Sequence, residues 1–247
     1  MRRTILLAVA GVIAFVAAAI ALMPASAFHA LLLQPRGVRA AQITGTIWSG
    51  QWHAVQVRSV HLAHVEGALD AVSLLQGRPA LQVRISDPRG RGDGRVVFGD
   101  GGVELHGLSG RVLPAGLVPL AGSGRAALGE PLVFADVQAR FGRRGCETAS
   151  GGVRFGGLLS LDTGGAGSLP VLDGSLECAG SLPAIRFAGE TADVRIDGHV
   201  RFGPEAASWS LNAEPRTGTM AMVLRSIGFD GSGDALRSEG QTGWDVR

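Results

Sequence analysis

The triplet Asp162-Thr163-Gly164 matches the Asp-Thr-Gly of aspartic proteases. In those enzymes two Asp carboxyl groups, one from each symmetric half, share a proton. This chain contains the triplet once, so a catalytic pair would require a homodimer. Because Asp and Gly also favour turns for reasons unrelated to catalysis, we interpret the triplet as a turn that follows a strand.

His61 and His64 have a spacing that could suit a metal ion, since positions i and i+3 share one face of a helix. The apolar residues around them alternate as in a strand, however, and on a strand these two positions point to opposite faces. No Glu lies between them as it does in the His-Glu-x-x-His motif. We therefore expect one buried and one exposed histidine rather than metal ligands.

The remaining short motifs also lack the residues that chemistry would need. Arg91-Gly92-Asp93 spells an adhesion tripeptide, but it overlaps an Asp-Gly turn signal and we interpret it as a hairpin tip. The stretch FGDGGVELHG lacks the Lys and the following helix of a phosphate-binding loop. No Gly-x-Ser-x-Gly nucleophile elbow is present. The sequence predicts no enzyme, no metal site and no cofactor.

Composition points to one β-rich domain that does not bind nucleic acid. All 23 basic residues are Arg, they are scattered, and the net charge is only +2. With 5% aromatic residues, the chain has few stacking platforms for bases. Its 38 glycines follow no period of three, and no Pro- or Ser-rich linker divides the 247 residues.

The N-terminus carries the signal of a membrane span. Arg2 and Arg3 precede Thr4–Met23, which has no charged residue and about the ~20 residues that a helix needs to cross a bilayer. By the positive-inside rule we expect residues 1–3 to be a cytoplasmic tip, residues 4–23 a transmembrane helix and the rest extracytoplasmic. Ala25-Ser26-Ala27 offers a competing signal-peptidase site, although the apolar run is long for a signal peptide.

Cys146 and Cys178 both lie in the part expected to be exported. An oxidising compartment favours a disulfide between them, and closing a loop of just over thirty residues would stabilise the fold by about 3–4 kcal/mol. Two buried free thiols are the alternative. Neither Cys has a partner at Cys-x-x-Cys spacing, which argues against a metal site.

After a connecting segment, residues 24–42, the pattern of residues 43–247 predicts a β-domain. Apolar residues recur at every second position, for example at Leu81, Val83 and Ile85, at Val133 through Val137, and at Val194 and Ile196. Strands of this kind bury one face. We predict a mostly β fold, in which the N-terminal transmembrane helix is followed by a curled antiparallel β-meander.

Turn signals set the expected hairpins. Asp-Gly supplies the positive φ angles of a tight hairpin turn, and it occurs at Asp93-Gly94, Asp100-Gly101, Asp173-Gly174, Asp197-Gly198 and Asp230-Gly231. We expect the clearest hairpin within ADVRIDGHVRFG. The stretches DAVSLLQGRPAL and LPAGLVPLAGSGRAAL each resemble a short helical turn followed by a strand, which suggests one or two short helices and a twofold repeat.

Two motifs carry a resemblance to a known family: Gly45-Thr46-Ile47-Trp48-Ser49-Gly50 and Leu74-Leu75-Gln76-Gly77-Arg78. Together with the apolar N-terminus, the cysteine pair and VLRSIGFDG, they resemble the type II secretion system protein N family. We expect Trp48 to pack the end of the curled sheet, with Gly45 and Gly50 allowing close approach. Anchoring at the membrane interface is the alternative for Trp48 and Trp52.

The resemblance implies an inner-membrane protein with its bulk in the periplasm. It implies an accessory, non-enzymatic adaptor of the machine that exports folded proteins across the outer membrane, with other secretion components as partners and no cofactor. Members of this family are also similar to AsmA-like envelope proteins, so a lipid-binding or lipid-handling module is the alternative function. That alternative rests on fold analogy.

Overall fold

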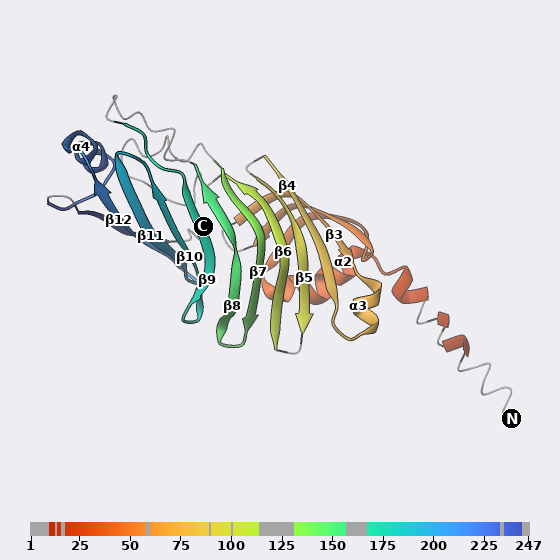
Figure 1. Ribbon diagram of the computed structural model, residues 1–247. Coiled ribbons are helices and arrows are strands. Elements are labelled where there is room, and N and C mark those ends of the chain that lie inside the picture. Colours follow the sequence, from red (N-terminus) through yellow and green to blue (C-terminus); the bar gives the residue numbers. More distant parts are fainter. Residues whose placement is uncertain are drawn as a thin grey trace.

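The computed structural model describes residues 10–12, 14–15, 18–57, 60–88, 90–99, 101–113, 131–156, 167–232 and 235–243. Its 13 strands form one antiparallel sheet, in which spatial order follows sequence order (Figure 1). The strands are β1 (Val38–Thr46), β2 (Ser49–Val57), β3 (Val60–Leu69), β4 (Ala80–Asp87), β5 (Gly90–Gly99), β6 (Gly102–Val112), β7 (Leu132–Gly142), β8 (Gly145–Phe155), β9 (Leu172–Ala179), β10 (Leu182–Glu190), β11 (Val194–Phe202), β12 (Ala206–Pro215) and β13 (Leu236–Gly243). This confirms the predicted antiparallel meander.

Besides the helical residues near the N-terminus, the described residues contain a few short helical elements. Ahead of β1 lie the helix α2 (Ala25–Phe28), the π-helical turn η1 (His29–Leu33) and the 3-10 turn η2 (Gln34–Arg36); the others are α3 (Ala71–Leu75) and α4 (Gly218–Ser226). The predicted short helix before β4 is therefore present as α3. Its predicted counterpart, and with it the test of a twofold repeat, lies outside the described residues.

Alternation along the strands gives the sheet one apolar and one polar face. In β4 Leu81 is buried and Val83 and Ile85 are half-buried, while Gln82 and Arg84 are exposed. In β11 Val194 and Ile196 are fully buried, and Arg195 between them is exposed. Because successive side chains of a strand point to opposite sides, the polar positions all fall on the other face.

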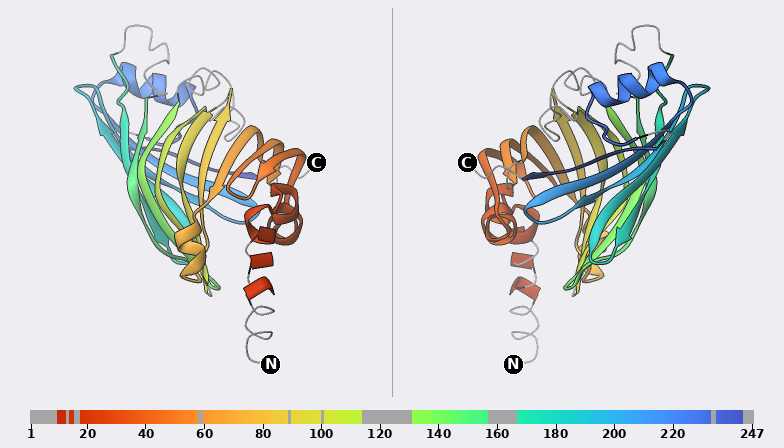
Figure 2. Two further views of the ribbon diagram at one scale, coloured as in Figure 1. Left: turned by 90° about the vertical axis from the view of Figure 1, so that its right-hand side faces the viewer. Right: turned by 90° about the vertical axis from the view of Figure 1, so that its left-hand side faces the viewer.

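The sheet is an open, strongly twisted and curled layer, and helices cover its apolar face at both ends (Figure 2). At one end, Met220, Ala221 and Leu224 of α4 pack in a C-terminal cluster with Phe229, Leu169, Leu172, Val194, Ile196, Ala213 and Leu236. At the other, Ala25 and Phe28 of α2 pack in an N-terminal cluster with Ile47, Trp52, Val55 and Leu69. In the described part of the chain, one cluster of buried residues thus lies at each end of the sheet.

Most of the Asp-Gly pairs were misread as hairpin turns. Asp93-Gly94, Asp173-Gly174 and Asp197-Gly198 lie inside β5, β9 and β11. A β-carbon on Gly174 would lie 2.8 Å from Cβ of Phe187, and one on Gly198 would lie 2.8 Å from Cδ2 of Leu211. The backbone carbonyl oxygens of Arg186 and Ser210 would lie closer still, each at 2.4 Å, so these glycines allow the neighbouring strands to approach closely.

A related expectation is corrected in the same way, and another is confirmed. Arg91-Gly92-Asp93 lies within β5 and is not a hairpin tip, because the β4–β5 turn closes one pair earlier, between Asp87 and Gly90. The β5–β6 turn does contain Gly101, between the paired residues Gly99 and Gly102, as predicted.

The alternation of Val133 through Val137 is interrupted by a bulge. Val133 is 41% exposed and Val137 is 8% exposed. Between them Asp136 has φ of 48°, and the register with β8 shifts between Ala135 and Gln138. A bulge inserts an extra residue into one strand, so the side chains beyond it change face.

The N-terminal part contains short elements ahead of the sheet. The first strand begins at Val38, and the segment before it contains α2, η1 and η2. Residues 18–21 are helical and lead into Pro24, which bridges to Thr46. Among the described residues, no helix has both the length and the apolar character that a membrane crossing needs.

Candidate functional site

The last strand, β13, forms an open edge of the sheet. Arg237 donates its backbone N–H to the Asp230 carbonyl at 2.7 Å and accepts the Asp230 N–H at 2.8 Å, on the side away from β12. Backbone groups alternate in direction along an antiparallel strand, so those of Glu239 and Gln241 also point away from β12. Within the described part of the chain, no further strand borders β13 there. This edge offers backbone groups to an added strand.

The opposite edge, β1, is partly covered. Pro24 forms an antiparallel bridge with Thr46, and α2 and η2 lie against the strand. The two edges therefore differ in what borders them: Pro24, α2 and η2 lie against β1, and Asp230 pairs with Arg237 of β13.

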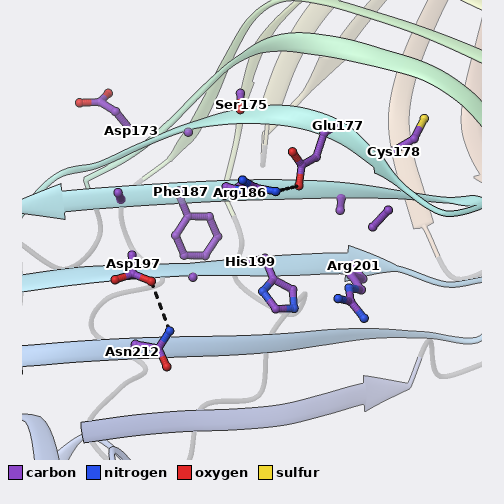
Figure 3. Close-up of a pocket in the computed structure, with 15 residues that line it drawn as sticks. Asp173, Ser175, Glu177, Cys178, Arg186, Phe187, Asp197, His199, Arg201 and Asn212 are labelled. Atoms are coloured by element: carbon purple, nitrogen blue, oxygen red, sulfur yellow. Dashed lines mark hydrogen bonds and ion pairs between the residues drawn. The ribbon is translucent and has the colours of Figure 1, made fainter. Parts of the chain in front are cut away.

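A shallow depression of about 770 Å³ lies on the polar face of β9 to β12 (Figure 3). Its lining includes the long polar side chains of Glu177, Arg186, His199 and Arg201. Small residues such as Ala184 lie at its base. The depression forms because small side chains stand between long charged ones on adjacent strands.

Ion pairs and hydrogen bonds link the long side chains of this depression. Arg186 Nη2 lies 2.9 Å from Glu177 Oε1, and Asn212 Nδ2 donates to Asp197 Oδ2 at 3.2 Å. Arg201 has no ionic partner among the described residues. Exposed pairs of this kind contribute little to stability. No described group of His, Cys, Asp or Glu is placed to hold a metal ion.

The first family motif forms the β1–β2 turn. Gly45 has φ of 84° and faces Gly50, and a β-carbon on Gly45 would lie 2.1 Å from the Ser49 carbonyl oxygen. Trp48 is half-buried against the N-terminal cluster, and its Nε1 donates to the Ala21 carbonyl at 3.0 Å. The motif thus joins the N-terminal segment to the sheet.

Trp52 is the fully buried tryptophan at this end of the sheet, and Trp48 packs against the same cluster from a half-buried position. Trp52 is 4% exposed, and its ring lies over two glycines, Gly50 and Gly67, where added β-carbons would each come within 2.7 Å of it. This role of Trp52 was not predicted from the sequence, although the Gly-x-Trp spacing on one strand face is a signal that indicates it.

The second family motif ends α3 and attaches it to the sheet. Gly77 has φ of 73°, which favours glycine, and Arg78 N–H bonds back to the Ser73 carbonyl at 3.0 Å. Arg78 Nη2 then contacts both carboxylate oxygens of Glu104 in β6 at 3.1 Å. The roles of Gly77 and Arg78 in this geometry are structural.

Two carboxylates beside α3 stay ionised. The hydrogen bond from the Ser73 hydroxyl lowers the pKa of Asp70, and backbone N–H groups of α3 and nearby Arg95 lower it further. The hydrogen bond from His106, followed by the charges of Arg78 and Arg140, lowers the pKa of Glu104. A carboxyl group with a lowered pKa is a poor proton donor near neutral pH, so these groups act as caps and ion-pair partners.

Cys146 and Cys178 form a disulfide, with an S–S distance of 2.03 Å. The two strands that carry them, β8 and β9, pair only along Gly152–Phe155 and Leu172–Ser175. The disulfide, together with the Cys146 N–H to Ser181 carbonyl bond of 2.8 Å, joins the other ends of these strands. The bridge therefore holds the sheet together where its hydrogen-bond ladder is interrupted.

The remaining candidate residues are not brought into a reactive site. His64 is half-buried on the polar face, where its Nδ1 lies 3.2 Å from Nδ1 of His53 and its Nε2 lies 3.3 Å from Glu66. The side chain of His61 and the triplet Asp162-Thr163-Gly164 lie outside what the structure describes. The partner of His64 is thus a residue of the adjacent strand, which sequence spacing did not indicate.

Comparison with known proteins agrees with the resemblance. A model of the family described as type II secretion system protein N matches residues 36–237. The type II secretion system protein N of Klebsiella pneumoniae is 27% identical over 223 residues, covering 83% of this chain and 81% of the relative. The protein of the same name from Vibrio cholerae serotype O1 is 27% identical over 198 residues, covering 74% of each chain. No solved structure matches the chain significantly. With a family match that spans most of the described sheet, the chain belongs to the type II secretion system protein N family.

Proposed function

We propose that this chain is a non-enzymatic adaptor of the type II secretion system, which supports export of folded proteins across the outer membrane. The residues Thr4–Met23 anchor it in the inner membrane, and the sheet stands in the periplasm. Family membership supports the link to secretion, and the uncharged N-terminal run supports the anchor.

The observation that carries an adaptor role is the open edge of β13. Strand addition to such an edge gives affinity through backbone hydrogen bonds, and alternate side chains add specificity. The outward-facing residues Glu239 and Gln241 are exposed and polar, which keeps the edge soluble until a partner strand pairs with it. Other secretion components of the inner membrane and periplasm are the expected partners.

A proline at position 241 tests this mechanism. Proline has no backbone N–H, so Gln241→Pro removes a donor that points outward and leaves the bonds to β12 in place. Gln241→Ala is the matched control, because it shortens the side chain but keeps the N–H. The assay deletes the gene, restores it on a plasmid, and measures how a secreted hydrolase divides between periplasm and medium.

We expect the deletion to trap the hydrolase in the periplasm, and wild type and Gln241→Ala to restore its release. Gln241→Pro, present at the same level in the membrane, should fail to do so. Full rescue by Gln241→Pro would rule out strand addition at this edge. Normal secretion in the deletion strain would contradict the adaptor function itself.

A second candidate, lipid handling, is favoured by one observation. On the apolar face of the central strands, Val96, Phe98, Leu105 and Phe134 are only half-buried, because the helices cover the two ends. Such a surface suits acyl chains. Purification of residues 24–247 without detergent, followed by lipid extraction and mass spectrometry, separates the two: a stoichiometric phospholipid supports lipid handling, and its absence opposes it.

A further inference from the structure

One rim of the sheet lies beside the N-terminal segment. Trp48 Nε1 bonds the Ala21 carbonyl at 3.0 Å, and the Ile47 N–H bonds the Met23 carbonyl at 3.1 Å. The Leu69 N–H in turn bonds the Ile47 carbonyl at 2.9 Å, immediately before α3. We call this end of the sheet the N-terminal rim. It comprises the β1–β2 turn, α3 and the turns that follow β5, β7 and β9.

The short helix on this rim exposes an apolar pair. Leu75 is 90% exposed and Val72 is 62% exposed, and positions i and i+3 share one face of a helix. The same helix uses Ser73 and Leu74 to pack inward, so Val72 and Leu75 are not needed for the core. The helix itself, Ala71–Leu75, contains no charged residue.

Basic residues extend along the same rim. Arg143 and Arg144 form the β7–β8 turn between the paired residues Gly142 and Gly145, and Gly142 pairs in turn with Gly102 of the neighbouring β5–β6 turn. Both arginines are exposed, and neither has an ionic partner among the described residues. The rim therefore combines an exposed apolar pair with unpaired positive charge.

The direction of the rim agrees with that of the N-terminal segment. In Figure 2 the gold helix α3 and the strand turns beside it project downward, and the red N-terminal residues run away from the sheet on the same side. Helix α4 lies at the opposite rim. A planar surface that receives the N-terminal segment would therefore meet α3 and its neighbouring turns before it met α4.

We propose that the N-terminal rim docks on a lipid membrane, with Val72 and Leu75 inserted between headgroups and Arg143 and Arg144 against anionic phosphates. This inference rests on the inner-membrane anchor proposed above. Apolar side chains on a helix that lies at the interface, with arginines on the same rim of the sheet, match the chemistry of an anionic bilayer surface. Two attachments, the anchor and the rim, then fix how the sheet stands on the membrane.

Site-specific fluorescence in proteoliposomes tests the proposal. Because both native cysteines are in a disulfide, a single introduced cysteine can carry an environment-sensitive dye in the full chain. Leu75→Cys reports on the rim, and Met222→Cys on α4 is the matched control, since Met222 is 62% exposed at the opposite rim. Phe15→Cys reports on the anchor. The vesicles contain phosphatidylethanolamine and phosphatidylglycerol, with nitroxide-labelled lipid as quencher.

We expect the dye at position 75 to be quenched several-fold more than the dye at position 222. Quenching at position 15 without quenching at position 75 would overturn the rim contact and leave the anchor intact; quenching at neither would overturn both. Protection of position 75 in native membranes but not in lipid vesicles would point to a protein partner, and would also overturn the proposal. If Arg143 and Arg144 contact anionic phosphates, the double variant Arg143→Gln with Arg144→Gln should show less quenching at position 75 in these vesicles. Unchanged quenching would overturn the proposed contact of the two arginines.

Discussion

At the scale of single residues, aromatic rings lying over glycines recur along the sheet. Trp52 covers Gly50 and Gly67, and Trp209 lies over Gly240, where an added β-carbon would come within 2.1 Å of the ring. The aromatic ring replaces the contacts that a missing side chain would have made. The glycine content of the chain therefore reflects packing in the sheet as well as turns.

Replacement of Trp52 tests this packing. Trp52→Ala should lower the free energy of unfolding by about 3–5 kcal/mol, because it removes a large buried side chain and leaves a cavity over two glycines. Trp48→Phe should cost only about 1 kcal/mol, since it loses one hydrogen bond and little buried surface. Urea unfolding of the full chain in detergent, followed by circular dichroism, measures both. Equal losses would contradict the assignment of Trp52 as the packing residue.

Buried His29 predicts a dependence of stability on pH. The side chain is 7% exposed, its Nδ1 has no described hydrogen-bond partner, and burial lowers the pKa of His29. The unfolded state, with a pKa of about 6.5, then takes up a proton before the folded state does. Stability contributed by neutral His29 should be complete above that pH and decrease as the pH falls below it.

The measurement is the melting temperature at pH values from about 8 to about 5, an interval that covers the titration of histidine. His29→Phe should flatten the decrease below pH 6.5. If His29→Phe retained the full decrease, another group would be responsible for it.

At the scale of elements, α4 closes one end of the apolar face. Its side chains Met220 and Leu224 are completely buried, whereas Met222 on the same helix is 62% exposed. The helix begins with Thr217, whose side chain accepts the Met220 N–H at 3.2 Å. The cap fixes the start of the helix and the buried side chains fix its face.

Leu224→Ala should destabilise the protein by about 2–5 kcal/mol, since it opens a cavity beneath α4. Met222→Ala on the exposed face should change stability by less than about 0.5 kcal/mol. Thermal unfolding of the two variants side by side checks this difference, and a similar shift for both would mean that α4 is not held by its buried face.

Loss of the disulfide gives a second prediction at this scale. Cys146→Ser with Cys178→Ser should reduce stability by about 3–4 kcal/mol, because the bridge closes a loop over a sequence separation of 32. Reducing agent should lower the melting temperature of the wild type to that of the double variant. The melting temperature of the double variant itself should not change. A wild type insensitive to reduction would contradict this contribution.

The elements that could be predicted from sequence are those set by local pattern. The alternation at Leu81 to Ile85 and at Val194 to Ile196, the short helix before β4, and the antiparallel order follow from period and proximity. Mid-strand Gly174 and Gly198 could not be recognised, because their role depends on Phe187 and Leu211 of neighbouring strands. The bulge at Asp136 and the His53–His64 contact depend equally on register between strands. The direction of the exposed groups on β13 required the Asp230 bridge.

At the scale of the whole molecule, two separate core clusters lie among the residues that the structure describes. The N-terminal and C-terminal clusters share no residue, and the strong contacts of the strands are with their sequence neighbours. Architectures of this kind behave as chains of neighbouring units with local stability. Damage at one end should therefore remain largely local.

Hydrogen exchange measures this locality. Leu224→Ala should accelerate amide exchange in β9 to β13 and leave β1 to β4 close to wild type, while Trp52→Ala should do the reverse. Uniform acceleration across all strands in either variant would show that the sheet unfolds as one cooperative unit.

The strands of this sheet pair in the order in which they occur along the chain. The sheet can therefore begin to form before the whole chain has been translocated. Each new strand finds its partner in the strand just before it, so the loops closed at each step are short and their entropic cost is small. If the polypeptide emerges from its N-terminus onward, the growing end always exposes one strand to be paired by the next. After β13 no strand follows within the described residues, and the growth site becomes the position that a partner's strand could occupy.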